Sequence, residues 1–177
     1  DGDGASDGYG VYAESDAGAF TLSDVSFRRV TNWPLYLANI SQWGRVSDVQ
    51  IDAATCARGS SAFVAGGSLA SNVRPATGVA WQVGDLTVPA GRTLTLDPGT
   101  ILKLTFALNV SGTLIAHGTP AAPVIITVPT DDSAGGDTDG DGGAAAPVVT
   151  AAWLTVLHGG TLDFTSVELR YRGLDVM

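Results

Sequence analysis

The sequence of 177 residues predicts an all-β fold in which short parallel strands stack as the coils of a β-solenoid. Good helix formers are scarce, because 16 of the 18 acidic residues are Asp and Lys103 is the one lysine. In their place the chain has 23 Gly and 8 Pro, a composition typical of short strands separated by tight turns. The chain also repeats itself at spacings that suit one coil of a solenoid.

The first repeat has a spacing of 24 residues. Residues 23–27 (Ser-Asp-Val-Ser-Phe) return as residues 47–51 (Ser-Asp-Val-Gln-Ile), and residues 165–169 are a third variant. Apolar and polar residues alternate in all three segments, so each predicts a strand with one face inward. The apolar members of the first two copies are predicted to point into the core: Val25, Phe27, Val49 and Ile51.

The middle of the chain repeats with a similar spacing. Residues 86–88 (Leu-Thr-Val) return after 22 residues as 108–110 (Leu-Asn-Val), and residues 98–103 are echoed by 123–127. Three short strands per coil of about 22–24 residues account for these repeats. Each strand then pairs with the equivalent strand of the next coil, which satisfies its backbone hydrogen bonds.

Two breaks in the pattern predict the domain organisation. The repeat dissolves near residues 72–79, so residues 1–80 are interpreted as the closing coils of one unit and residues 81–177 as the opening coils of the next. Residues 130–147 are rich in Gly and contain five Asp, which predicts a surface loop inserted between strands.

The two units also share sequence. Residues 1–4 match 139–142 and residues 24–28 match 166–170, at spacings of 138 and 142 residues. Two matches in the same order predict a longer tandem array, of which this chain is an internal or processed piece.

Charge and composition exclude several classes of protein. The net charge of −9 argues against nucleic acid as a partner, because phosphate binding needs clustered Lys and Arg. No apolar stretch approaches the roughly 18 residues of a membrane span. The single cysteine, Cys56, cannot form an internal disulfide.

Much of the second half resembles the right-handed parallel β-helix units of large bacterial surface proteins, which have the pectate-lyase-like fold. The resemblance covers about half of the chain and lies in residues 81–91, 94–100, 110–114, 118–120, 131–142 and Trp153. It implies a secreted protein at the cell surface that serves as a stalk, an adhesin segment or a filament subunit. Fold alone does not fix function.

The inserted loop carries a candidate calcium site. Asp137, Asp139 and Asp141 alternate before a Gly turn, as in calcium loops, because Ca²⁺ takes six to eight oxygen ligands from flexible backbone. The twelfth position is Val148, so the loop does not end as an EF-hand does. Further ligands are expected from Asp131 and Asp132, from carbonyl groups and from water. Asp1 and Asp3 are interpreted as remnants of an equivalent upstream site.

Two classes of function remain open. The first is a structural module that stacks end to end on copies of itself or on adjacent repeat units, with surface glycan as a further partner. The alternative is a glycan-active β-helix, a polysaccharide lyase or hydrolase, in which Asp24 and Asp48 could line a row of carboxylates. Their repetition is explained more simply by a turn before each inward Val. No catalytic residue is therefore assigned, and a structural role is expected.

Overall fold

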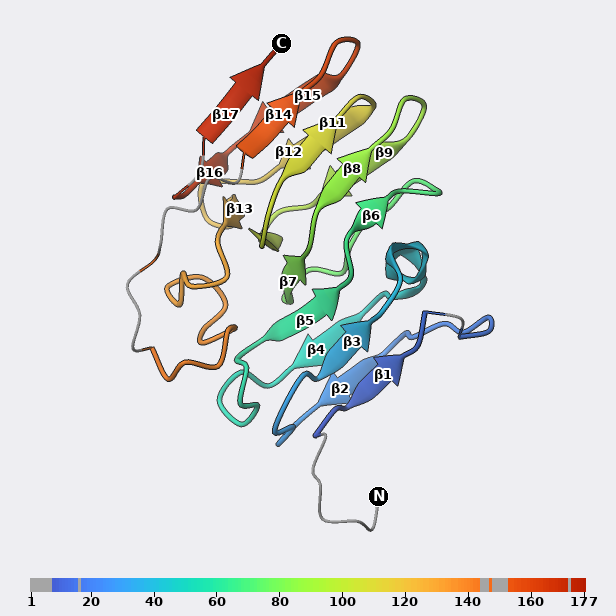
Figure 1. Ribbon diagram of the computed structural model, residues 1–177. Coiled ribbons are helices and arrows are strands. Elements are labelled where there is room, and N and C mark those ends of the chain that lie inside the picture. Colours follow the sequence, from blue (N-terminus) through green and yellow to red (C-terminus); the bar gives the residue numbers. More distant parts are fainter. Residues whose placement is uncertain (1–7, 16, 144–146, 148–152, 172) are drawn as a thin grey trace.

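The computed structural model describes residues 8–15, 17–143, 147, 153–171 and 173–177. Within these residues the chain is all-β, with seventeen strands and one short 3-10 helix, η1 (Ile40–Arg45). The strands lie in tiers between the N-terminal and C-terminal ends of the molecule (Figure 1). Every pairing between these strands is parallel, which is consistent with a β-solenoid.

The described strands form four sheets. The seven-stranded sheet has the order β1 (Val11–Ala13), β3 (Leu35–Leu37), β5 (Ser61–Val64), β7 (Ala80–Val83), β10 (Ile101–Leu104), β13 (Val124–Thr127) and β16 (Val167–Leu169). The five-stranded sheet has the order β17 (Gly173–Val176), β14 (Trp153–Val156), β11 (Leu108–Val110), β8 (Leu86–Val88) and β6 (Gly67–Ser68). The smaller sheets are β15 (Thr161–Thr165), β12 (Thr113–His117) and β9 (Thr93–Leu96), and the pair β2 (Val25–Phe27) and β4 (Val49–Ile51).

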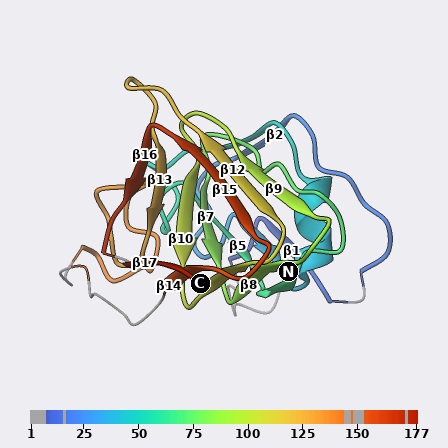
Figure 2. The same ribbon diagram turned by 90° about the horizontal axis from the view of Figure 1, so that it is seen from above.

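The chain visits the three larger sheets in turn. Strands β7, β8 and β9 belong to different sheets, and each pairs with the strand three places later in the chain. Viewed along the stack, the sheets lie as separate sides around a common interior (Figure 2). This path explains how a chain of short strands satisfies its backbone hydrogen bonds, since each strand finds its partner one coil away.

The predicted repeats correspond to strand pairs. Val25 pairs with Val49, Leu86 with Leu108 and Ile101 with Ile125, as the spacings of 24, 22 and 24 residues require. Other coils depart from the predicted length. Ala62 pairs with Trp81 after 19 residues, and Leu35 pairs with Ala62 after 27 because longer turns are inserted there.

The interior is filled by the apolar residues that alternate along the strands. Phe27, Val49 and Ile51 are buried in the core, and Val25 is half-buried against it, which confirms their predicted inward orientation. The other core side chains are mainly Leu and Val, including Leu35, Leu37, Leu86, Val88, Leu94, Leu102, Leu104, Leu108, Val110 and Leu114. Their side chains stack in rows because equivalent residues of successive coils are in register.

The tryptophans lie in two environments. Trp43 of η1 and Trp81 of β7 are fully buried in the core, with ring centroids 5.7 Å apart. Trp33 is buried outside that core, against Tyr36 and Phe63. The side chain of Trp153 lies outside the described residues.

Asp24 and Asp48 lie in equivalent turns. Asp24 has φ 57°, Asp48 has φ 50°, and Ser166 of the third sequence variant has φ 49°. Short polar side chains tolerate this left-handed region better than most L-residues. Each residue directly precedes a strand, so the structure places both aspartates in turns.

Other predictions about organisation are not decided by the fold. The pairing of β5 with β7 carries the seven-stranded sheet across residue 80, where the boundary between the two units is predicted. That boundary stays a prediction. Asp1 and Asp3 lie outside the described residues. In the described part of the chain, no helix has the length and apolar character needed to cross a membrane.

Candidate metal site

The acidic loop lies on the outer face of the seven-stranded sheet, between β13 and the next described strand, β14 (orange in Figure 1). Its position depends on β10, where Leu102 and Leu104 point into the core and Lys103 between them points outward. Lys103 is nevertheless fully buried, because the loop covers it.

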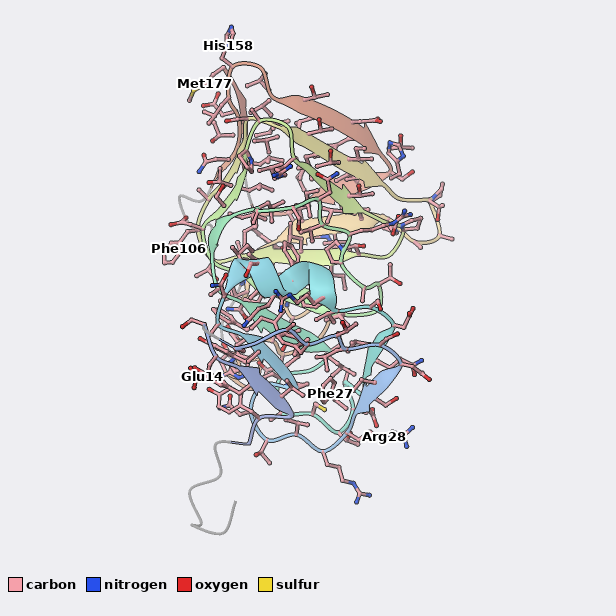
Figure 3. The ribbon with its side chains drawn as sticks, turned by 90° about the vertical axis from the view of Figure 1, so that its right-hand side faces the viewer. Glu14, Phe27, Arg28, Phe106, His158 and Met177 are labelled. Carbon is pink, nitrogen blue, oxygen red and sulfur yellow. The ribbon has the colours of Figure 1, made fainter. Side chains whose placement is uncertain are left out.

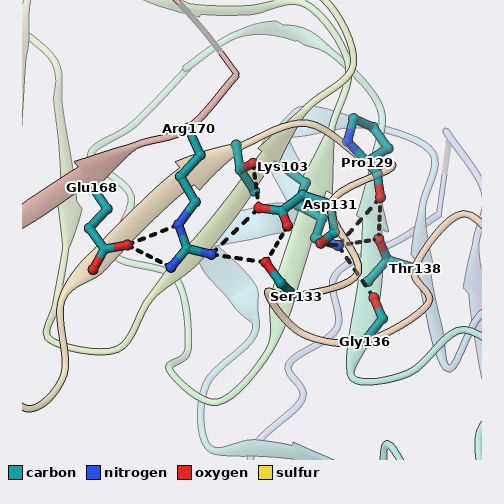
Figure 4. Close-up of polar contacts among 9 residues, drawn as sticks. Lys103, Pro129, Asp131, Ser133, Gly136, Thr138, Glu168 and Arg170 are labelled. Carbon is teal, nitrogen blue, oxygen red and sulfur yellow. Dashed lines mark hydrogen bonds and ion pairs between the residues drawn. The ribbon is translucent and has the colours of Figure 1, made fainter. Parts of the chain in front are cut away.

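The ammonium group of Lys103 is surrounded by oxygens of the loop (Figure 4). Nζ donates to the hydroxyl of Thr138 at 2.6 Å and to the carbonyl of Asp131 at 2.9 Å. The carbonyls of Pro129 and Gly136 lie at 3.4 Å. Burial lowers the pKa of Lys103 to about 8, although four neighbouring aspartates favour its charged form.

The carboxylate of Asp131 points away from the other acidic residues. Its Oδ2 accepts a hydrogen bond from Thr127 at 2.8 Å, and its Oδ1 accepts one from Ser133 at 2.5 Å. The guanidinium of Arg170 lies 3.6 Å from Oδ2. Burial alone would raise the pKa of Asp131, but these hydrogen bonds and the cations Arg170 and Lys103 hold the pKa below its ordinary value.

Three other carboxylates converge. One oxygen each from Asp132, Asp137 and Asp141 lies within 4.8 Å of the others, a separation that one cation could bridge. Oδ1 of Asp132 is buried and has no hydrogen-bond partner among the described residues. A buried carboxylate oxygen without a partner is costly, so a cation or an ordered water there would satisfy it.

The turn of the loop is built around Asp137. Oδ1 accepts from the backbone N–H of Gly140 at 2.7 Å and of Asp141 at 3.1 Å, and Oδ2 accepts from Gly142 at 2.9 Å. Gly140 and Gly142 have φ values of 77° and 75°, which explains why Gly occupies both positions. Burial opposes ionisation of Asp137, yet the backbone donors outweigh it and lower its pKa.

The crowding of negative charge affects the other two carboxyls differently. The pKa of Asp132 is raised by burial and then by the charges of Asp139 and Asp137. The pKa of Asp139 is raised by burial and then by its hydrogen bond with Asp137. A bound divalent cation would reverse this repulsion, because an opposite charge at close range favours the ionised form.

The predicted ligand set therefore divides. The structure brings together Asp137, Asp141 and Asp132, whereas the carboxylate of Asp131 is engaged with Thr127, Ser133 and Arg170. Asp139 lies beside Asp137 and accepts from the N–H of Asp141, outside the set of three oxygens. No helix flanks the loop in the described residues, as its incomplete EF-hand pattern predicted.

Sequence reasoning missed the basic residues that hold the loop. Lys103 is the one lysine of the chain and occupies a position next to core leucines, which is the signal that could have found it. Arg58 and Arg170 lie far from the loop in sequence, and no local pattern connects them to it. Their role follows from coil stacking alone.

The comparisons with known proteins add no constraint. No family model, no curated protein and no solved structure matches this chain.

Proposed function

We propose that this chain is a right-handed parallel β-helix that serves as a structural module of an extracellular surface protein. Its use would be as a stalk, an adhesin segment or a filament subunit that stacks end to end on further coils. One observation carries this proposal: all three larger sheets end in an unpaired strand at the same end of the stack, at β15, β16 and β17. Unpaired strand edges are templates for further strands.

The side chains at this end support the same role. Leu174 and Val176 follow Leu154 and Val156 in register, and those two residues are buried in the coil below. Leu174 is 45% exposed and Val176 68% exposed. Met177 lies at this end and Phe27 near the opposite end (Figure 3). A following coil, from a second copy or from a neighbouring unit, would bury these side chains as β17 buries those of β14.

The first test is the association of the 177-residue chain. We expect its average mass in solution to rise with concentration, as measured by sedimentation velocity, because stacking removes apolar surface from water. Val176→Lys should weaken the association at least tenfold. Phe106→Lys is the matched control, since Phe106 is 60% exposed but lies on the side of the stack. A parent chain that stays monomeric at every concentration, with no rods in electron micrographs, contradicts the proposal.

We also propose calcium as the ion of the acidic loop, with Asp132, Asp137 and Asp141 as its carboxylate ligands. The observation in favour is the buried, unpartnered oxygen of Asp132 beside two converging carboxylates. Calcium prefers oxygen ligands and tolerates irregular geometry, so loop carbonyls and water could complete its coordination.

Calorimetry tests this site. The expected dissociation constant is on the order of 10⁻⁴ to 10⁻³ M, the range of extracellular calcium modules. The double variant with Asp137→Asn and Asp141→Asn should bind at least tenfold more weakly, because two charges of the site are lost. Asp175→Asn is the control, since it removes an exposed carboxylate on β17. If millimolar calcium produces neither heat nor a change in the melting temperature of the parent, the ion site must be abandoned.

A glycan-active β-helix is the alternative function. A groove lined by Ser26, Phe27, Arg28, Gln50, Ile51 and Asp52 lies along β2 and β4, near the end opposite Met177 (Figure 3). It contains one carboxylate, whereas glycoside hydrolysis generally uses two. Oδ1 of Asp52 already accepts the backbone N–H of Ala54 at 3.2 Å. The groove therefore supports catalysis less well than the open end supports stacking.

The exposed aromatic row gives equally little support for sugar stacking. Tyr12, Tyr36 and Phe63 are neighbours across β1, β3 and β5, with ring centroids 4.9 and 4.6 Å apart and nearly parallel planes. Their faces are largely covered by one another. Sugars stack on ring faces, so this row is better explained as a contribution to the stability of the coil stack.

A further inference from the structure

Three basic side chains from distant parts of the chain hold the acidic loop. Arg58 precedes β5, Lys103 lies on β10, and Arg170 follows β16. They are three of the nine Lys and Arg residues in the sequence. The net charge of the chain is −9, so cations are scarce, and their concentration on one short segment indicates a specific role.

At the N-terminal side of the sheet the loop is bound by Arg58 and Ser60. Nη1 of Arg58 donates to the carbonyl of Asp139 at 2.7 Å and to that of Thr138 at 3.3 Å. Its guanidinium lies 4.5 Å from the ring centroid of Trp33, which fixes its orientation. The backbone N–H and the hydroxyl of Ser60 both donate to the carbonyl of Gly135, at 3.0 and 3.1 Å.

The loop also packs closely against the sheet at Gly135. A Cβ on this glycine would lie 2.5 Å from Cβ of Ala80 on β7 and 3.7 Å from Cδ1 of Ile101 on β10. Gly135 has φ 82°, a second reason for glycine at this position. The loop backbone therefore touches β7 and β10 directly.

At the C-terminal side the loop is bound by Arg170. Nη1 donates to the hydroxyl of Ser133 at 3.2 Å and lies 3.6 Å from the carboxylate of Asp131. The same guanidinium donates twice to Glu168 of β16, at 2.9 and 2.6 Å, which fixes its position (Figure 4). Asp131 is in turn bonded to Thr127 of β13.

These contacts involve β5, β7, β10, β13 and β16, or residues beside them, and the five strands are consecutive neighbours in the seven-stranded sheet. We propose that residues 129–139 form a clasp that ties these five coils together along the stack, with Lys103 as the positioning residue at its centre. The clasp deepens the structural role proposed above and rests on it for its biological use. Its contacts need no bound calcium.

Lys103 determines the shape of the clasp because its four oxygen partners come from both ends of the segment, Pro129 and Asp131 on one side and Gly136 and Thr138 on the other. Without the ammonium, the buried carbonyls of Asp131 and Gly136 would lose this donor. Buried carbonyls that lose a partner are costly, so the loop is expected to lift from the sheet and admit water.

Hydrogen–deuterium exchange with chelator present tests the clasp. Lys103→Met should speed exchange at least tenfold in peptides from 129–139 and also in β5, β7, β10 and β13, because the coils are then held by their ladders alone. Arg58→Gln and Arg170→Gln should speed exchange at their own ends of the clasp, and they serve if Lys103→Met fails to fold. Arg74→Gln is the control, since Arg74 pairs with Asp97 away from the loop.

The outcomes are distinct. Faster exchange in the loop alone, with unchanged strands, would show that the loop is a passenger on the sheet and would overturn the clasp. Unchanged exchange in all three variants would overturn it as well. Failure of the chain to associate in sedimentation experiments would count against the stacking role and leave the exchange result intact, so the two proposals fail separately.

Discussion

Replacing Trp81 by alanine is expected to lower the free energy of unfolding by about 3 to 5 kcal/mol, the range for a large buried aromatic side chain. Trp81 is fully buried at the centre of β7. Its neighbours in register are Ala62 and Leu102, and its ring lies 5.7 Å from that of Trp43. The indole therefore fills core space shared by successive coils, and alanine would leave a cavity between them.

Equilibrium unfolding in urea measures this effect. Trp81→Phe separates packing from hydrogen bonding, because it keeps an aromatic ring but removes the 2.8 Å hydrogen bond from Nε1 to the carbonyl of Ala76. That loss should cost about 1 to 3 kcal/mol. Phe106→Ala is the control and should change stability by less than about 0.5 kcal/mol, since Phe106 is 60% exposed. Equal losses for Trp81→Ala and Phe106→Ala would contradict the assignment of Trp81 to the core.

The sequence is sufficient to predict strand class and much of the register, because both depend on local alternation and on exact repeats. Leu86 and Leu108 occupy equivalent places in nearly identical segments, and they pair as the repeat requires. The irregular coils are less predictable. Gly67 and Ser68 form a two-residue strand without any apolar alternation, and its pairing with β8 follows only from the coils around it.

The acidic loop shows a similar division. The alternation of Asp137 and Asp141 before glycines is visible in the sequence, and the structure brings these two carboxylates together with Asp132. The orientation of Asp131 depends on Thr127 and Ser133 nearby and on Arg170, which lies 39 residues later. Contacts of this kind are set by which coils stack side by side, so composition and spacing within the loop could not reveal them.

The buried ammonium of Lys103 makes stability depend on pH in an unusual direction. Its pKa falls from 10.5 to about 8 because burial disfavours the charged form more than the carboxylates Asp131, Asp132, Asp139 and Asp137 favour it. Between these two pH values the unfolded chain binds a proton that the folded chain has released. The free energy of unfolding therefore rises with pH in this window, by about 1.4 kcal/mol per pH unit for one proton. Below pH 8 both states are protonated and this contribution is constant.

Comparison with Lys103→Met isolates this contribution, since titration of the tyrosines affects both proteins alike and cancels in the difference. We expect the stability of the parent relative to Lys103→Met to be constant from pH 6 to 7.5 and to increase by about 2 to 3 kcal/mol by pH 10. Lys103→Arg should show no such increase, because a guanidinium stays charged throughout the range. Urea unfolding at each pH, with chelator present to remove any bound cation, gives the three curves. A difference between parent and Lys103→Met that stays flat to pH 10, or that falls, would show that the ammonium of Lys103 is not buried at a cost beneath the loop.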